Sequence, residues 1–289
     1  MEVLMHGDAT AARVQELVLR FEAAHAELGP DDDQRHFCGL YLRSTRAMQR
    51  ELEAGGFRDG AWVGDLVVVF ATRYLDALRS WRAGAAVPLP WELALQPRPG
   101  VPPLVQQLVG LNAHLNFDLP QVLLEVLDDA DVADAELMRR RAADFRHVDT
   151  VMLRRMPEES RRLRALGGPA AAELLSRLLY PLNLLASRHW LVQARVLVWH
   201  NAAELSRARA AGPDALRQRT TDLEVLCAAA VDEVLRPGLV LLRLARTGFG
   251  VRLPQRPQRA TARPPAVPSA DGPPAATPAA PPEPVRARR

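Results

Sequence analysis

The chain has 289 residues, of which 48% are hydrophobic, 25% charged and only 5% aromatic. That hydrophobic share is enough for a sizeable core and excludes general disorder, while the scarcity of strand-forming aromatic side chains favours helices. The net charge of +3 lies mostly after residue 254, where six arginines accompany only Asp271 and Glu283. The rest of the chain is nearly neutral, so we expect no nucleic-acid partner.

The composition also bears on the source and the compartment. The chain contains no Lys and no Ile, which we interpret as the imprint of a GC-rich bacterial genome. Cys38 and Cys227 are far apart and fit no metal or redox spacing, as is typical of a reducing cytosol. No signal-peptide region is evident, and Arg188 and Arg195 interrupt the longest candidate membrane span. We therefore expect a cytoplasmic protein.

Apolar residues recur at helical spacing along nearly the whole chain. A first amphipathic helix is expected over 10–28, a second after the acidic run 31–33, and a third over 60–81. An irregular, proline-rich stretch follows over 84–103, with a short turn at 91–93. Further helices are expected over 104–116, 119–127, 134–156, 158–166, 169–186, 188–210, 213–235 and 239–245.

These elements predict an all-α protein. We expect a single bundle-like domain over 31–250, with the N-terminal amphipathic helix of residues 1–30 packed on its core. Residues 251–289 are rich in Pro, Ala and Arg and are expected to form a disordered tail. The proline-rich segment 264–268 or the terminal arginines could dock a protein partner, but a solvated tail is the interpretation we favour.

The densest polar signal is the segment 110–120, with the sequence GLNAHLNFDLP. On a helix, His114 and Asp118 lie four residues apart on one face, as do Asn112 and Asn116. Such a pair could share a divalent metal ion, or Asp118 could orient His114 as a general base. The structural alternative is that Asp118 caps the helix starting at 119, and that the asparagines close the preceding helix.

Two further charged residues stand on apolar helical faces. Asp144 lies at the edge of such a face and needs a partner, which makes an ion pair more plausible than an active-site acid. Arg73, inside the apolar stripe of the third expected helix, is its natural partner. Arg195 stands four residues before Trp199, where the guanidinium could stack on the indole.

His200 and Glu204 form a second pair at a spacing of four residues. Together with His114 and Asp118, the spacing is similar to that of the paired His/acid helices of zinc-dependent phospholipases and nucleases. These four residues are weak metal-ligand candidates only, because such a site needs further ligands that the sequence does not supply. The chain lacks a phosphate-binding glycine loop, a G-x-S-x-G elbow and an HExxH motif.

Several segments together resemble one bacterial family, the domain of unknown function 5995. They are FCGLYLRST (37–45), residues 56–81, Trp91 and, most specifically, segment 110–120. The resemblance covers about 33–245 and excludes the N-terminal helix and the tail. The family has no assigned activity. The resemblance does not cover His147 or His200, and it leads us to expect Asn where this chain has Asp149. The residues to which it points are Arg73, Tyr74, Asn112, His114, Asn116, Asp118, Asp144 and Trp199.

Two hypotheses about function follow. In the first, a small-ligand-binding protein or enzyme has an inter-helix pocket with His114, Asp118 and Asp144 as catalytic groups. Its ligand contacts would come from Arg73, Tyr74, Asn112, Asn116 and Trp199, and it could be a metal-dependent hydrolase. In the second, the chain is a non-enzymatic helical scaffold whose polar cluster is structural. Convergence of the polar residues on one cavity would favour the first hypothesis.

Overall fold

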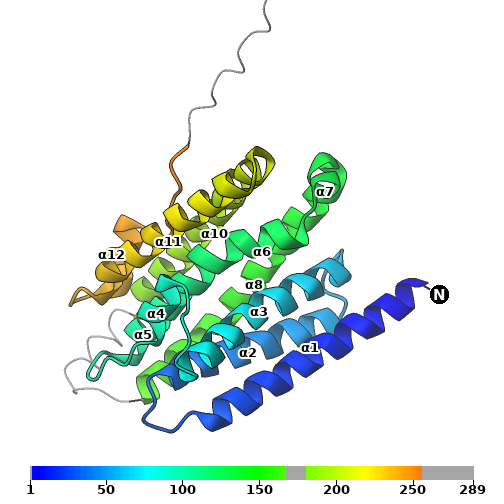
Figure 1. Cartoon of the computed structure of the whole chain (residues 1–289). Helices are drawn as coiled ribbons and strands as arrows, with labels where there is room; N and C mark the ends of the chain where they lie inside the picture. Colours follow the sequence, from blue (N-terminus) through cyan, green and yellow to red (C-terminus); the bar gives the residue numbers. More distant parts are fainter. Residues whose placement is uncertain (1, 167–179, 256–289) are drawn as a thin grey trace, which may run out of the picture. The chain divides into compact units, whose positions relative to one another are not determined.

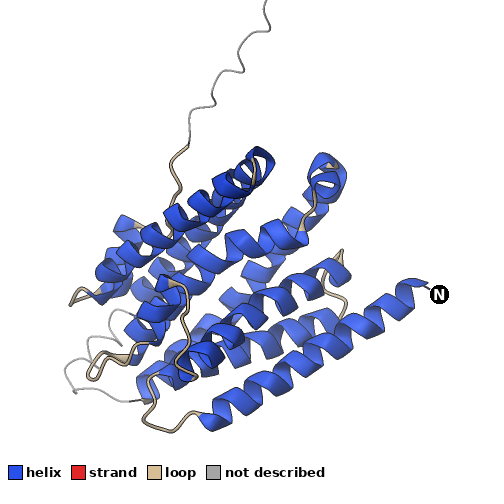
Figure 2. Cartoon of the chain, in the orientation of Figure 1, coloured by secondary structure: helices blue, strands red, loops and turns tan. Residues whose placement is uncertain are grey.

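A computed structural model of the chain describes residues 2–166 and 180–255, and within these ranges it consists of helices and connecting loops without a strand (Figure 2). The predicted all-α class is confirmed for these residues. No helix among them is long and apolar enough to cross a membrane. The helices are α1 (Glu2–Glu27), α2 (Gln34–Glu53), α3 (Gly60–Arg82), α4 (Leu89–Leu95), α5 (Pro103–Leu111), η1 (Asn112–Asp118), α6 (Leu119–Val126), α7 (Asp129–Ala133), α8 (Ala135–Ala165), α10 (Tyr180–Ala211), α11 (Pro213–Leu235) and α12 (Val240–Thr247).

Residues 1–254 form one compact unit. Within this unit, α1 packs along both α2 and α3 (Figure 1). Its apolar stripe, which includes Leu17 and Phe21, is buried against α2 and α3 next to Tyr74. Each large apolar side chain buried in this way stabilises the fold by about 1.5–3 kcal/mol, which is why this amphipathic helix is held on the core.

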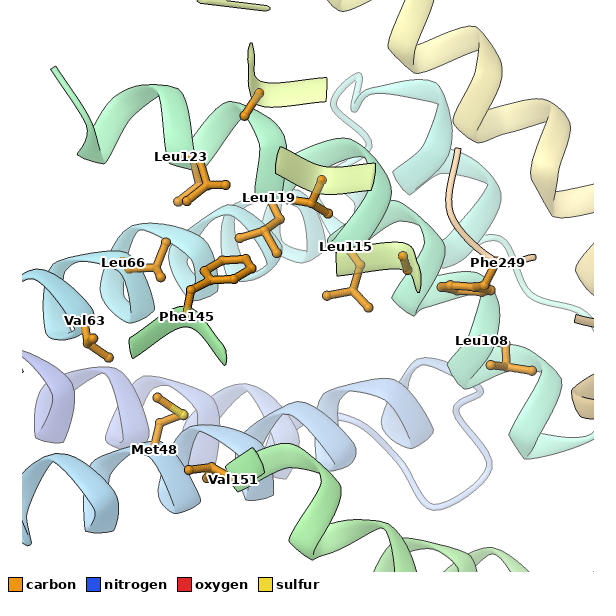
Figure 3. Close-up of a cluster of buried hydrophobic side chains, with 14 of the residues drawn as sticks. Met48, Val63, Leu66, Leu108, Leu115, Leu119, Leu123, Phe145, Val151 and Phe249 are labelled. Carbon is orange, nitrogen blue, oxygen red and sulfur yellow. The ribbon is translucent and has the colours of Figure 1, made fainter. Parts of the chain in front are cut away.

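A second core cluster joins the first three helices to the rest of the unit. Met48 of α2 and Leu66 of α3 meet Leu119 of α6 and Phe145 of α8 (Figure 3). Small side chains of α10, such as Ala194, complete the cluster. Leu, Val and Ala dominate this core, as the low aromatic content predicts.

The segment from Pro103 to Val126 is one continuous helical run whose middle, η1, is a π-helix. Pro120 explains the wide turn: it has no N–H for the carbonyl of Asn116, and its ring would clash with that carbonyl in a regular α-helix. The predicted break at this point is therefore wrong. Asp118 has helical backbone angles and makes no capping hydrogen bond, so its predicted N-cap role is also wrong.

Two other predicted breaks are absent. Helix α8 continues through Pro157, where we expected two helices, and α10 continues across 186–188. A proline inside a helix removes one hydrogen bond and crowds the carbonyl four residues earlier, which can kink a helix without ending it, and here the ion pair between Arg155 and Glu159 spans the site. Helix α7 was not predicted; Asp128 and Asp131 form its capping box. The expected helical residues 169–179 and the tail residues 256–289 lie outside the described ranges.

The chain leaves α12 at Gly248, whose φ of +92° suits glycine, and continues without helical structure over 249–254. Val251 and Leu253 are buried, and Phe249 belongs to the second core cluster (Figure 3). The predicted start of the tail at 251 is therefore too early, because apolar side chains at alternate positions fix this stretch to the core.

Candidate functional site

The imidazole of His114 lies inside a cage of aromatic side chains and is only 3% exposed. The ring of Phe70 is stacked on it, with centroids 3.5 Å apart and an angle of 9° between the planes. Tyr41 approaches edge-on at 4.3 Å, and Phe37 and Trp91 lie just beyond 6 Å. Helices α2, α3 and α4 thus each contribute an aromatic wall to a histidine carried by the π-helix.

Neither ring nitrogen of His114 has a hydrogen-bond partner within the described structure. Burial, and to a smaller extent the positive charge of Arg195, hold the pKa of His114 well below its ordinary value. The ring is therefore neutral at pH 7, with one nitrogen ready to accept and the other to donate a hydrogen bond. A buried polar group left unpaired costs about 1–3 kcal/mol.

The carboxyl of Asp118 lies close to that ring, with Oδ2 3.7 Å from His114 Nδ1. This distance is too long for a hydrogen bond. The same oxygen accepts a hydrogen bond of 2.9 Å from Trp91 Nε1. Burial raises the pKa of Asp118 to about 7, with the charge of Arg73 and the Trp91 bond acting in the opposite direction. Asp118 can therefore gain or lose a proton near neutral pH.

Charged and partly exposed residues adjoin this pair. Arg73 influences Asp118 electrostatically but forms its ion pair with Glu125 of α6. Tyr41 and Phe70 are partly exposed, whereas His114 and Asp118 behind them are buried. Burial and the charge of Asp118 raise the pKa of Tyr41, so its phenol stays protonated. The structure thus brings His114, Asp118 and Arg73 into one neighbourhood.

The asparagines of η1 make structural contacts. Asn112 Nδ2 donates to the backbone carbonyl of Cys227 in α11 at 2.7 Å. Asn116 Nδ2 donates to Asn112 Oδ1 and to the carbonyl of Phe249, both at 2.9 Å. The structural alternative predicted that the asparagines close a helix, and this is wrong. They tie the π-helix to α11 and to the segment after α12.

Asp144 lies elsewhere and does not pair with Arg73, so that prediction is wrong. Its two carboxylate oxygens accept hydrogen bonds from the backbone N–H groups of Arg58 and Asp59, at 2.9 and 2.8 Å. Both N–H groups lie just before the first turn of α3. The N–H groups at the start of a helix have no partner within the helix and need an acceptor from elsewhere. Asp144 thus anchors the start of α3 to α8, and its predicted catalytic role has no support from its position.

Arg195 and Trp199 belong to a cluster with Phe145 and Asp149, from which the charge of Arg195 still acts on His114. Arg195 Nε lies 2.6 Å from Asp149 Oδ1, and its guanidinium stands 3.8 Å over the ring of Phe145. The predicted stacking on Trp199 is therefore replaced by stacking on Phe145, which Trp199 contacts edge-on at 5.1 Å. Burial raises the pKa of Asp149, with Arg195 opposing it.

The second predicted histidine pair makes contacts within the fold. His200 Nε2 donates to the carbonyl of Leu253 at 2.9 Å, while Glu204 pairs with Arg219 at 3.1 Å. Among residues 2–166 and 180–255, no group of three or more His, Cys, Asp or Glu side chains is placed to hold a metal ion.

A small cleft lies behind the aromatic cage. Its lining includes Phe37, Tyr74 and Trp91 together with the polar side chains of Gln34 and Arg98, and its free space is about 20 Å³. That volume suits one water molecule rather than a larger ligand. Tyr74, predicted as a ligand contact, is fully buried between this cleft and Phe21.

Sequence reasoning missed the cage itself. Phe37 and Tyr41 fall in the second expected helix, Phe70 in the third and Trp91 in a short turn, and nothing in their spacing indicates a shared neighbour. The aromatic content of 5% gives no sign that four of these few side chains lie around one histidine, which only the structure shows.

Comparison with known proteins identifies the family but no activity. No curated protein and no solved structure matches the chain. A family described as of unknown function, DUF5995, matches residues 14–237. The match includes most of α1, which the sequence resemblance excluded, and ends before α12. With more than three quarters of its length matched, the chain belongs to the DUF5995 family.

Proposed function

We propose that this protein binds a small polar molecule at His114 and Asp118 and performs acid–base chemistry on it. The observation that carries the proposal is the pair of unpaired nitrogens on a buried histidine. A histidine kept only for structure would be expected to have a partner, because leaving it unpaired lowers stability. A ligand that accepts from one nitrogen and donates to the other would recover that cost.

The protonation states support the same proposal. A neutral His114 can accept a proton from a ligand, and Asp118, with its pKa of about 7, can donate one. Two groups whose environments move their pKa values in opposite directions are typical of an acid and a base in one site. Arg73, close to Asp118 and partly exposed, would favour a ligand carrying negative charge.

A ligand must pass the aromatic cage to reach these groups. Tyr41 and Phe70 are the cage residues that are partly exposed, so rotation of their side chains is the route we favour. Aromatic walls would also exclude water from the reacting groups, which strengthens hydrogen bonds inside the site. We place the activity in the cytoplasm, where the free thiols of Cys38 and Cys227 would persist.

The competing function is a helical scaffold, and the structural contacts of Asn112, Asn116 and Asp144 favour it. The two functions predict different effects on ligand binding when the His114 imidazole is replaced by a ring without nitrogen. His114→Phe keeps an aromatic ring in the cage but cannot bind a polar ligand. As a matched control, His189→Gln changes an exposed histidine.

The test is a thermal-shift screen of all three proteins against small organic acids, phosphate esters and divalent metals, followed by elemental analysis of each protein as purified. We expect ligands that raise the melting temperature of the wild type and the control but not of His114→Phe. A metal that is lost only in His114→Phe would make the site metal-dependent. If every ligand shifts all three proteins equally, the binding proposal is wrong and the scaffold stands.

A further inference from the structure

The segment that follows α12 is held in a groove in the way that a bound peptide is held. Its backbone carbonyl groups at 249, 251 and 253 accept hydrogen bonds from Asn116, Asn201 and His200, each at 2.9 Å. The N–H of Leu253 donates to Asn201 Oδ1, also at 2.9 Å. One asparagine side chain thus binds both a carbonyl and an N–H of the extended backbone.

These contacts come from three different helices. Asn116 belongs to η1, His200 and Asn201 to α10, and Arg219 of α11 donates to the carbonyl of Pro254. Arg219 is itself buried and is held by Glu204. The groove therefore supplies a row of polar side chains to the peptide backbone, without strand pairing.

The side chains of the segment alternate between the groove and solvent, as expected for extended backbone. Phe249, Val251 and Leu253 are buried, whereas Arg252 is exposed. Leu253 packs with Phe117, Leu205, Leu223 and Cys227 in a small apolar cluster of its own.

Position 250 adds a size restriction. A Cβ at Gly250 would lie 2.7 Å from Leu197 Cδ1 and 3.0 Å from the backbone Cα of Ala194. The leucine side chain could move, but the backbone of α10 could not move without disturbing the core. The groove thus selects the pattern Phe-Gly-apolar-X-Leu: an aromatic residue, a glycine, an apolar residue, any residue and a leucine.

We propose that the groove between η1, α10 and α11 is a peptide-binding site for this pattern, occupied by the chain's own residues 249–253, which can be exchanged for the same segment of a second copy. Gly248 provides the hinge at which the segment separates from α12. The proposal concerns binding only and is independent of the chemistry proposed for His114.

The test uses the full chain with Leu253→Arg. Leu253 is fully buried, so the segment cannot bind in the groove without burying the charge of the arginine. The matched control is Arg252→Ala, at the exposed neighbouring position. The probe is a fluorescent peptide of residues 247–255, TGFGVRLPQ, and the measurement is fluorescence anisotropy. A second peptide carries Gly250→Val.

We expect saturable binding of the first peptide to the Leu253→Arg chain and at least about tenfold weaker binding to the wild type and Arg252→Ala. In those two chains the attached segment competes at an effective concentration on the order of millimolar. The Gly250→Val peptide should not bind. A folded Leu253→Arg chain that fails to bind, or equal binding to all three chains, would overturn the proposal.

A second measurement decides the matter if Leu253→Arg does not fold. A protease recognition sequence is inserted between Thr247 and Gly248, and the folded chain is cleaved. We expect the fragment from 248 onward to stay with the body in size-exclusion chromatography and to be displaced by excess TGFGVRLPQ. Unfolding of the cleaved body, or a fragment that cannot be displaced, would mean that the segment is part of the core and not an exchangeable ligand.

Discussion

Replacing Asp118 with asparagine should stabilise the protein at alkaline pH. The asparagine keeps an oxygen to accept the hydrogen bond from Trp91 and cannot ionise. In the wild type, burial raises the pKa of Asp118 from 3.8 to about 7. At about 1.36 kcal/mol per pKa unit, ionising this carboxyl in the folded protein opposes folding by up to about 4 kcal/mol.

The pH window follows from the direction of the shift. Between about pH 4 and pH 7 the folded protein retains a proton on Asp118 that the unfolded chain releases, so stability falls as the pH rises through this range. The advantage of Asp118→Asn should therefore be largest above pH 8 and shrink to less than half at pH 5. The lowered pKa of His114 acts in the opposite direction, but it is present in both proteins and largely cancels in the difference.

The assay is urea unfolding followed by far-UV circular dichroism at pH 5 and pH 8.5. Asp76→Asn, at a carboxylate that is about half exposed, is the control and should change stability little at either pH. The reasoning fails if Asp118→Asn is no more stable than the wild type at pH 8.5. It fails equally if the difference is the same at both values.

Three further substitutions test the structural assignments, each by the same urea unfolding. Asp144→Ala should lower stability by about 3 kcal/mol, because two backbone N–H groups before α3 lose a buried, charged acceptor; a loss below about 1 kcal/mol would contradict the anchoring role. Arg195→Met should cost about 3 kcal/mol by leaving the partly buried Asp149 unpaired, and adding Asp149→Leu should recover much of it. Gly110→Ala should cost about 1–3 kcal/mol, because its Cβ would lie 2.6 Å from the ring of Phe37; unchanged stability would show that this contact is loose.

The helices that the sequence predicts best are those with clear end signals. The acidic run before α2 and the glycines after it bracket that helix, and α11 begins at Pro213 and ends at Leu235 as expected. The run through η1 was missed because the sequence Asp118-Leu119-Pro120 has the same pattern as a helix start. Local sequence does not distinguish a proline that begins a helix from one that widens it into a π-turn.

The candidate site was predictable only in part. His114 and Asp118 were found because both lie in one short segment. The aromatic residues around them were not, because they come from α2, α3 and α4. The partner of Asp144 could not be inferred, because backbone N–H groups leave no mark in the sequence. Arg73 was assigned to the wrong carboxylate for a similar reason: Glu125, its actual partner, looks like any surface acid.

The π-helix also sets the relative rotation of the two helices that it joins. Each residue of an α-helix turns the chain by about 100°, so a run with one residue too many places everything after it on a different side. Deletion of one residue within 112–117 would take the extra residue out of the wide turn and would rotate α6 relative to α5 by about that angle, although Pro120 would still disfavour a regular turn there. Asp118 would then leave Trp91, and Glu125 would leave Arg73. The wide turn therefore fixes the rotation of α6 relative to α5, and with it the neighbours that each of the two helices faces.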